Sequence, residues 1–399
     1  MKRAAIVAPC RTAVGKFGGR LRNVDAGHLA AVAIKGTVDR SGVPADAIDD
    51  VIFSQSYSNG ETPCIGRWAA LAAGLPVELP GMQLDRRCGG GLQAILTAAA
   101  LVQSGAFEVV LAGGVESMSN IEYYTTDMRW GTRSGSSRLH DRLERGRERS
   151  QPEARFGYIS GMIETAENVA REFGITREQA DIFALSSHRL AAEALKASRF
   201  AEEIVPVVAT NARGEEQRFQ EDEGIREGLT IDALAALRPI LPEGTVTAGN
   251  ASQQSDAAAA CLVVSEDRLD ALGLTPMAFV TDWTIAGCDP RLMGIAPVPA
   301  VEKLRARTGL SFDDFDLVEI NEAFACQVLA VLKKWDWFDT SRLNVNGSGI
   351  SLGHPIGATG ARILTTLLYE LHRRKGRFAL ETMCIGGGQG IAAIFERAI

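Results

Sequence analysis

The sequence predicts an α/β protein in which two similar halves enclose an inserted segment. Short apolar segments typical of strands alternate with segments typical of helices in the N-terminal part. The expected strands cover residues 4–7, 51–53 and 109–111, and the expected helices cover 29–40 and 91–104. This alternation is typical of a sheet covered by helices. The helix from residue 91 is apolar nearly all round, so we expect it to be buried on all sides.

The C-terminal part repeats the N-terminal part, which predicts the two halves. Segments 45–55 and 312–322 each consist of an acidic turn that leads into a short apolar strand. The segment around Cys88, with its helix and the strand 109–117, resembles residues 353–371 followed by 378–390. Two copies of a pattern favour a pseudo-two-fold pair over a longer repeat array. A site at their junction would draw on strand ends and loops of both halves.

The inserted middle segment differs in composition from both halves. Residues 128–155 contain eight arginines against four acids, with Gly and Ser between them, which predicts irregular, solvated structure. This arginine cluster could also meet phosphates. Thr176 and Gln179 have the spacing of a capping box, and apolar residues follow at helical spacing, so a helix is expected there.

Bulk composition narrows the function classes. A chain of 399 residues with 46% apolar and 23% charged residues suits two or three globular domains. A net charge of −7 argues against binding to nucleic acid or a membrane surface. Seven cysteines without a CxxC pair indicate reduced thiols. The sequence shows no pattern of a secretory signal, a membrane-spanning segment or a peroxisomal targeting tripeptide. We therefore expect a cytoplasmic protein.

Cys88 is the first candidate for chemistry. It directly precedes Gly89, Gly90 and Gly91 at the start of the buried helix. The N-terminus of a helix can lower a thiol pKa, and glycines leave backbone N–H groups unshielded. We expect these glycines to make space for a bulky acyl group and its oxyanion. The alternative is an inert cysteine packed at a tight turn.

His354 and Asn321 are candidates for proton transfer and for positioning. His354 lies in the rigid, glycine-rich loop 353–360. There it could take a proton or donate a hydrogen bond to an oxyanion. The alternative is a histidine that only forms a hydrogen bond to the backbone of the turn. Asn321 follows an expected strand. It could position a water, or cap an apolar helix that begins near residue 323. A buried Glu322 would need a partner.

Cys384 precedes a second glycine cluster at the matching place of the second half. A metal site is its obvious rival, but Cys88 and Cys384 lack a close ligand pair, so no metal is expected. A disulfide between them stays open. Dinucleotide, phosphate-loop, zinc-protease and serine-hydrolase motifs are missing from the sequence.

Five motifs together resemble the thiolase family over essentially the whole chain. They are RCGGGLQA (87–94), AGNAS (248–252), NEAFA (321–325), NVNGSGISLGHPIGATG (344–360) and CIGGGQG (384–390). The resemblance implies two βαβαβαββ halves in a five-layered αβαβα core with a loop domain that holds coenzyme A. It predicts the halves at 1–118 plus 250–270 and at 271–399, and the loop domain at 119–249.

The resemblance also implies the reaction and the residues. Thiolases cleave a 3-ketoacyl-CoA with free CoA, or condense two acyl-CoA molecules, as acetyl-CoA acetyltransferases or 3-ketoacyl-CoA thiolases. Matched by motif, Cys88 is the nucleophile, His354 activates it and holds the thioester oxygen, and Cys384 moves the α-carbon proton. Asn321 would hold a water in one oxyanion hole, and the N–H groups of Cys88 and Gly386 would form the other. The residues expected along the pantetheine arm and acyl group are Ser252, Met162, Met293, Ala323 and Phe324. Coenzyme A is a substrate, no cofactor is expected, and a homo-oligomer, tetramer or dimer, is implied.

Several positions depart from the family pattern and leave the acyl length open. Asp85 and Gly90 stand where Asn and Ser are usual around the nucleophile, and Gly161 stands where some members carry a histidine at the acyl site. Two rival functions remain: a decarboxylating ketosynthase-like enzyme, which does not need Cys384, and a catalytically silent acyl-CoA carrier.

Overall fold

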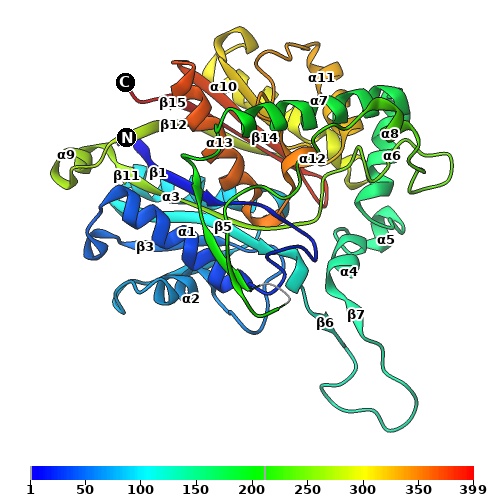
Figure 1. Ribbon diagram of the computed structural model, residues 1–399, viewed down its shortest axis with the longest axis horizontal. Coiled ribbons are helices and arrows are strands. Elements are labelled where there is room, and N and C mark those ends of the chain that lie inside the picture. Colours follow the sequence, from blue (N-terminus) through cyan, green and yellow to red (C-terminus); the bar gives the residue numbers. More distant parts are fainter. Residues whose placement is uncertain (1, 211–212) are drawn as a thin grey trace.

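The computed structural model describes residues 2–210 and 213–399 and contains two halves built from matching elements (Figure 1). The N-terminal half comprises β1 (Ala4–Thr12), β2 (Gly15–Lys16), α1 (Ala26–Ser41), β3 (Asp50–Ser54), α2 (Ile65–Ala72), β4 (Met82–Leu84), α3 (Gly90–Ser104), β5 (Val109–Ser117) and β11 (Ser255–Ser265). The helix α9 (Leu269–Leu272) connects it to the second half. The C-terminal half comprises β12 (Pro276–Gly287), α10 (Pro297–Thr308), β13 (Leu317–Ile320), α11 (Ala325–Trp335), α12 (Gly349–Leu352), α13 (Thr359–Arg373), β14 (Phe378–Ile385) and β15 (Gln389–Arg397).

The strand order confirms the predicted repeat. The sheet runs β13-β14-β15-β12-β1-β11-β5-β3-β4, with β2 beside β11 and β8 (Ile204–Val205) beside β1. The halves meet where β1 pairs antiparallel with β12. In each half a parallel pair, β3 with β5 or β13 with β14, is followed by antiparallel strands. Helix α2 was not predicted from the sequence.

The apolar clusters show five layers, as the resemblance implied. Helices α3 and α13 lie in the middle, where their side chains share one core with strands of both halves, such as β5 and β14. Helices α1 and α2 pack on the outer face of the N-terminal half, and α10 and α11 cover that of the C-terminal half. Helix α3 is apolar nearly all round because it is covered from two directions, whereas α13 also buries polar side chains such as Arg362 and Glu370.

The glycines after Cys88 make room for neighbouring backbone and side chains, so the expected reason for them is wrong. A Cβ on Gly89 would lie 2.5 Å from Cδ1 of Ile385, and one on Gly90 would overlap the hydroxyl of Ser54. A Cβ on Gly91 would lie 2.8 Å from the backbone nitrogen of Ala361 at the start of α13. These contacts let the N-terminal turns of α3 and α13 meet.

The inserted segment contains more regular structure than predicted. Its elements are β6 (Tyr123–Tyr124), β7 (His140–Asp141), α4 (Arg142–Glu148), α5 (Glu153–Phe156), α6 (Met162–Phe173), α7 (Arg177–Lys196), β8, β9 (Val207–Thr210), β10 (Glu216–Phe219) and α8 (Ile231–Ala235). The predicted capping box is present at the start of α7. Helices α4 and α5 lie within the stretch expected to be irregular, because short polar helices carry little apolar periodicity. The predicted domain limits stay a prediction.

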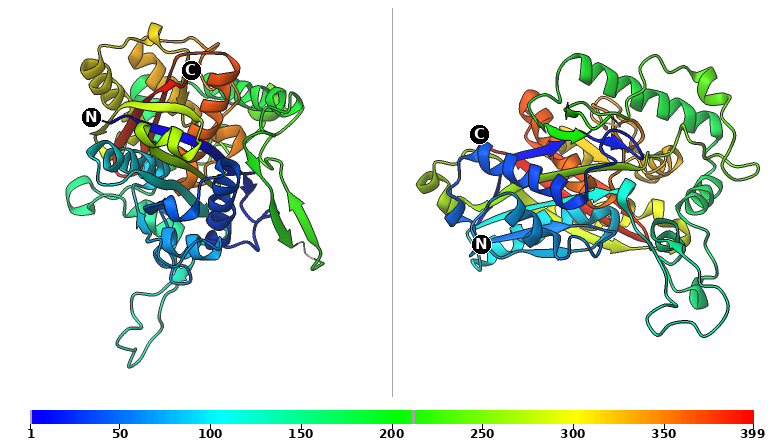
Figure 2. Two further views of the ribbon diagram at one scale, coloured as in Figure 1. Left: turned by 90° about the vertical axis from the view of Figure 1, so that its left-hand side faces the viewer. Right: turned by 60° about the horizontal axis from the view of Figure 1, so that its bottom comes forward.

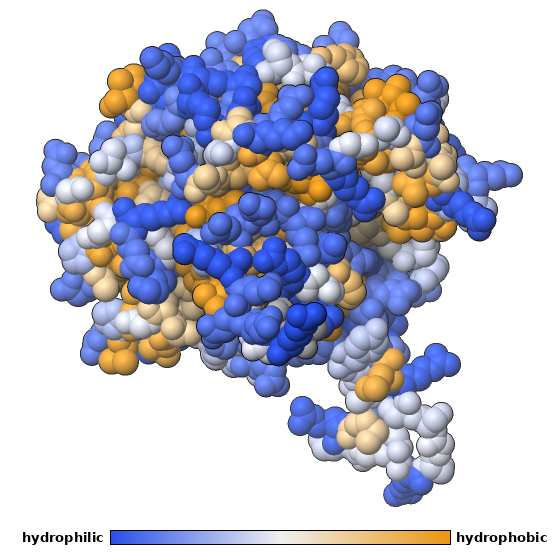
Figure 3. All heavy atoms as spheres, in the orientation of Figure 1, coloured by the Kyte–Doolittle hydropathy of each residue, from blue (hydrophilic) through white to orange (hydrophobic). Residues whose placement is uncertain are grey.

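The loop between β6 and β7 stands away from the rest of the molecule (Figures 1 and 2). It carries exposed apolar side chains next to polar ones, as Figure 3 shows. Trp130 is 95% exposed and Leu139 is 73% exposed.

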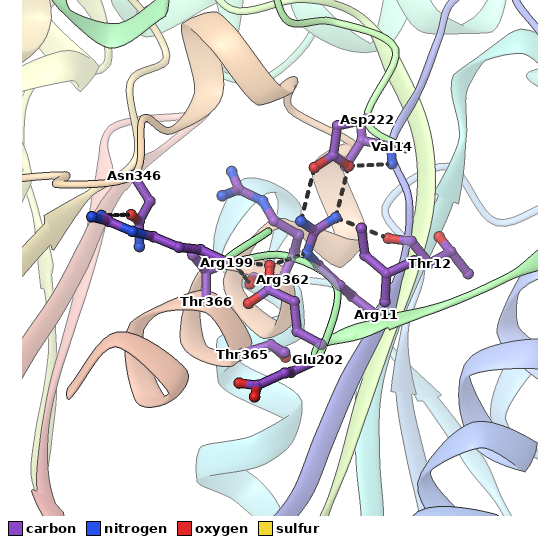
Figure 4. A network of polar contacts seen from close by, with 12 residues as sticks. Arg11, Thr12, Val14, Arg199, Glu202, Asp222, Asn346, Arg362, Thr365 and Thr366 are labelled. Carbon is purple, nitrogen blue, oxygen red and sulfur yellow. Dashed lines mark hydrogen bonds and ion pairs between the residues drawn. The ribbon is translucent and has the colours of Figure 1, made fainter. Parts of the chain in front are cut away.

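A buried arginine attaches the inserted segment to the sheet (Figure 4). Arg11 of β1 is fully buried and donates to Glu203 at 2.7 Å and to both oxygens of Asp222 at 2.7 and 2.8 Å. Glu203 also accepts a hydrogen bond from Thr366 of α13 at 2.9 Å. A buried charge needs such partners, so these contacts connect strand, insertion and middle helix.

Two buried carboxyl groups lie side by side on neighbouring strands. Glu319 of β13 is the register partner of Glu381 of β14, and both side chains are buried. One oxygen of Glu319 and both oxygens of Glu381 have no hydrogen-bond partner among the described residues. Burial raises the pKa of both groups well above the ordinary value, although nearby Arg362 opposes the effect. Burial therefore favours the protonated form of both carboxyl groups.

Gly91→Ala tests the contact between the two middle helices. The added methyl group meets backbone that cannot turn aside, so we expect a loss of about 1–3 kcal/mol in unfolding free energy. Urea denaturation monitored by tryptophan fluorescence measures it. Gly60→Ala is the control, since its Cβ meets nothing closer than 4.0 Å. Equal stability of the two variants would contradict the close contact.

Glu381→Gln tests the carboxyl pair. A carboxyl whose pKa is raised by folding contributes stability below its unfolded pKa, and this contribution is lost as pH rises through the folded value. We therefore expect the variant to lose less stability than the wild type between pH 5 and pH 8 in urea titrations. Glu302→Gln, on the exposed surface of α10, should follow the wild type. Parallel curves for Glu381→Gln and wild type would refute the prediction.

Candidate active site

One pocket of about 550 Å³ at the junction of the halves gathers nearly all the residues predicted from the sequence. Those that line it are Cys88, Met162, Ser252, Met293, Ala323, Phe324, His354, Cys384 and Gly386. Asn321 does not line the pocket but lies directly behind His354. A pocket of this size is typical of sites for small organic ligands.

Cys88 lies in a short 3-10 turn, Arg87–Gly89, between β4 and α3. Burial raises the pKa of the Cys88 thiol, while the N–H of Gly386 and the charges of Arg87 and Arg147 oppose this in part. The thiol is therefore protonated at neutral pH and needs a base before it can act as a nucleophile. The hydrogen bond also places the Gly386 N–H directly at the sulfur.

His354 is held at one ring nitrogen, which leaves the other for the pocket. Its Nδ1 is 2.6 Å from the hydroxyl of Thr359, and its backbone N–H donates to the carbonyl of Gln253 at 3.0 Å. Burial, with the charges of Arg362 and Arg147, lowers the pKa of His354 to about 3. A neutral imidazole that lines the pocket can accept a proton from a thiol through its other ring nitrogen.

Asn321 supports the histidine from behind and is not the helix cap that the sequence left open. Helix α11 begins at Ala325 with Phe324 in the cap position. The side-chain nitrogen of Asn321 is 3.5 Å from Nδ1 of His354, and its oxygen has no partner among the described residues. That oxygen can accept a hydrogen bond from a water or a ligand.

The neighbouring Glu322 has the partners that its burial requires. It accepts hydrogen bonds from Ser187, Asn344 and the N–H of Ile350. It therefore ties the segment after β13 to helix α7 and to the start of α12. This satisfied network fixes the backbone that carries Asn321.

Cys384 lies near the end of β14 and lines the same pocket as Cys88. Burial raises the pKa of Cys384 well above its ordinary value, and a negative charge on Cys88 raises it further. All seven cysteines are free, so Cys88 and Cys384 form no disulfide. Gly386 follows in the β14–β15 turn. A Cβ at Gly386 would lie 3.6 Å from the Met162 sulfur, so its environment is more open than that of the glycines after Cys88.

A buried glutamate joins the two loops that hold Cys88 and His354. Glu116 of β5 accepts hydrogen bonds from the N–H groups of Ser56, Tyr57 and Gly357. Burial raises the pKa of Glu116 to about 7. Ser56 in turn donates to the carbonyl of Arg87. The position of the pocket wall thus depends on a residue that sequence reasoning did not single out.

Sequence reasoning did not single out two arginines and one tyrosine that line the pocket with the nucleophile. Tyr57, Arg87 and Arg147 all line the pocket. Arg87 directly precedes Cys88 and has a left-handed backbone with φ of +48°, which marks a constrained position. Arg147 belongs to the arginine-rich segment 128–155, and no local signal separates it from its solvated neighbours.

The described residues form neither a metal-binding cluster nor a membrane-spanning helix. Within residues 2–210 and 213–399, no three His, Cys, Asp or Glu side chains gather in an arrangement that could hold a metal ion. Over the same ranges, no helix has the length and apolar character needed to cross a membrane.

Comparison with known proteins identifies the family. The Thiolase, N-terminal domain family matches residues 4–267, and the Thiolase, C-terminal domain family matches residues 274–397. The chain is 44% identical over 407 positions to an acetyl-CoA acetyltransferase of Cupriavidus necator, with 100% of both chains covered. The structure of the Bacillus anthracis acetyl-CoA acetyltransferase is 41% identical, with a TM-score of 0.95 and coverage of 100% and 99%. Human mitochondrial 3-ketoacyl-CoA thiolase in complex with CoA is 38% identical, with a TM-score of 0.93 and coverage of 100% and 98%. The chain therefore belongs to the thiolase family.

Proposed function

We propose that this protein is a thiolase that cleaves 3-ketoacyl-CoA with free CoA, or runs the reverse condensation of two acyl-CoA molecules. The observation that carries the proposal is the meeting of Cys88, His354 and Cys384 in one pocket. The chemistry needs a nucleophile for the acyl group, a base for that nucleophile and a second acid or base for a C–H bond. These three side chains supply the three groups.

In the cleavage direction, His354 takes the proton of Cys88, and the sulfur attacks the 3-keto carbon of the substrate. The bond between carbons 2 and 3 then breaks, which leaves an acyl group on Cys88 and the enolate of acetyl-CoA. Cys384 gives its proton to carbon 2 of that enolate, and acetyl-CoA leaves. Cys384, now a thiolate, takes the proton of the CoA thiol, and the CoA sulfur takes the acyl group from Cys88. His354 returns its proton to the Cys88 sulfur, which restores the starting enzyme.

Two sets of donors support the charges that develop in these steps. The N–H groups of Cys88 and Gly386 face the oxygen of the acyl group on Cys88, a role supported by the hydrogen bond from Gly386 to the sulfur. His354 and a water held by Asn321 face the oxygen of the CoA thioester, where the enolate forms. The free oxygen of Asn321 supports this role.

The pocket residues disfavour the two rival functions. A decarboxylating ketosynthase-like enzyme needs no second cysteine, yet Cys384 lines the same pocket as Cys88. A silent carrier would lack the histidine or the second cysteine, and both are present. Ser252, Met162, Met293, Ala323 and Phe324 are assigned to the walls that hold pantetheine and acyl group.

We also propose that the enzyme acts in the cytoplasm as a homo-oligomer. The seven free cysteines support a reducing compartment. The exposed Trp130 and Leu139 on the β6–β7 loop support contact with another subunit. Tryptophan is among the residues that contribute most at protein interfaces.

Cys88→Ala and Cys384→Ala together test the proposed function. With acetoacetyl-CoA and CoA, we expect both variants to lose at least about 1,000-fold in turnover, measured by the formation of acetyl-CoA. Mass spectrometry with acetyl-CoA alone should show an acetyl group on Cys384→Ala and none on Cys88→Ala, because only Cys88 carries the acyl group. Normal turnover by Cys88→Ala would overturn the assignment.

Trp130→Ser combined with Leu139→Ser tests the oligomer. Loss of these apolar contacts should shift the protein to a smaller assembly in size-exclusion chromatography with light scattering. Phe338→Ser is the control, because this side chain is 57% exposed but lies outside the loop. An unchanged mass for the loop variant would show that the loop does not hold subunits together.

A further inference from the structure

The pocket contains positive charge that the thiolase reaction itself does not use. Arg87 and Arg147 line it, whereas Glu144, which is exposed, is its only lining carboxylate. The remaining lining side chains are neutral at pH 7, including His354 with its lowered pKa. The pocket next to the nucleophile is therefore suited to an anion.

Arg147 is half-buried and has no partner within the part of the chain that the structure describes. Its guanidinium makes no hydrogen bond and no ion pair there, unlike Arg142, which pairs with Glu122, and Arg145, which contacts His140. A partly buried guanidinium with five N–H donors gains most from a planar anion such as a carboxylate. The missing partner is best supplied by a ligand.

The backbone around Arg147 directs this side chain toward the pocket. Helix α4 ends beside the turn after β14, where a Cβ added to Gly387 would lie 2.9 Å from the backbone oxygen of Ser150. On the other side is Gly161, whose added Cβ would lie 3.6 Å from Cβ of Arg147. Gly161 has φ of +140°, so a residue with a side chain is disfavoured there. The space beside Arg147 thus stays open.

Two contacts orient the Arg87 side chain so that its charge, like that of Arg147, lies at the lining of the pocket. Its Nη2 donates to the carbonyl of Gly146 at 3.0 Å, and its guanidinium lies over the Tyr57 ring at 5.6 Å. Tyr57, Met118 and Ile356 form an apolar cluster against Cys88. This cluster makes an apolar wall next to the nucleophile, with cations at its edge.

Both cations lie near the reacting end of the pocket. The charges of Arg87 and Arg147 both act on the Cys88 thiol, and that of Arg147 also acts on His354. The phosphates of coenzyme A are separated from its thiol by the whole pantetheine arm. A cation beside Cys88 therefore meets the acyl group and not the nucleotide.

We propose that Arg147, assisted by Arg87, binds a carboxylate at the far end of a short acyl chain, so that the preferred substrate is a dicarboxylic 3-ketoacyl-CoA. The inference rests on the proposed thiolase function and adds the substrate class. The apolar wall receives the methylene groups, and the guanidinium pairs with the terminal carboxylate. A neutral acyl chain of equal length leaves that cation unpaired.

Thiolysis of two thioesters matched in length tests the proposal: the mono-CoA thioester of 3-ketohexanedioic acid and 3-ketohexanoyl-CoA. We expect the wild type to prefer the carboxylate-bearing thioester by at least about tenfold in kcat/KM. Arg147→Gln should lower this ratio by about 10- to 100-fold, and Arg147→Lys should retain part of it. Arg149→Gln, two residues further along on the exposed surface, should leave the ratio unchanged.

Each other outcome has a distinct meaning. A wild-type ratio near one, with both thioesters cleaved, overturns the inference and leaves the thiolase function in place. An equal loss of kcat with both thioesters in Arg147→Gln overturns it in favour of an electrostatic role toward the thiol. A raised KM for CoA with either thioester overturns it in favour of phosphate binding. Cleavage of neither thioester, nor of acetoacetyl-CoA, is instead the failure of the proposed function itself.

Discussion

The contact between the N-terminal turns of α3 and α13 is the constraint on which the rest of the structure depends. Each helix is buried between the two parts of the sheet, and each begins next to a residue of the pocket, Cys88 or His354. The turns meet because Gly91 faces Ala361 without a side chain, and Gly360 likewise faces the backbone of Leu92. Close backbone approach at a helix end is a use for which glycine alone is suited. The distance between nucleophile and base is therefore set by helix packing.

Burial of these turns also determines the protonation states in the pocket. It raises the pKa values of Cys88 and Cys384 and lowers that of His354, so all three groups are uncharged at neutral pH. Transfer of a proton from thiol to imidazole creates two charges in a medium of low dielectric constant. The N–H of Gly386 favours the thiolate in that state.

Glycine-rich motifs at matching places of the two halves predicted the repeat, and with the resemblance to thiolases they predicted nine of the 25 residues that line the pocket. The sequence predicted the wrong reason for the glycines after Cys88, since the directions of their missing side chains become visible only when α13 and β14 are placed. Helices α4 and α5 were missed because charged residues dominate them. The carboxyl pair of Glu319 and Glu381 could not be foreseen either, since a contact across strands depends on register.

The residue proposed to select the acyl group, Arg147, and the residues proposed to carry out the reaction lie in different parts of the chain. Cys88, His354 and Cys384 belong to the two halves, whose packing fixes their positions, whereas Arg147 comes from the short helix α4 of the inserted segment. A side chain on such a segment can change without disturbing the helix contact that aligns the reacting groups. Arg87 is different, because it adjoins Cys88 and has a constrained backbone. A cation contributed by the insertion can therefore select the acyl group while the halves retain the same reaction.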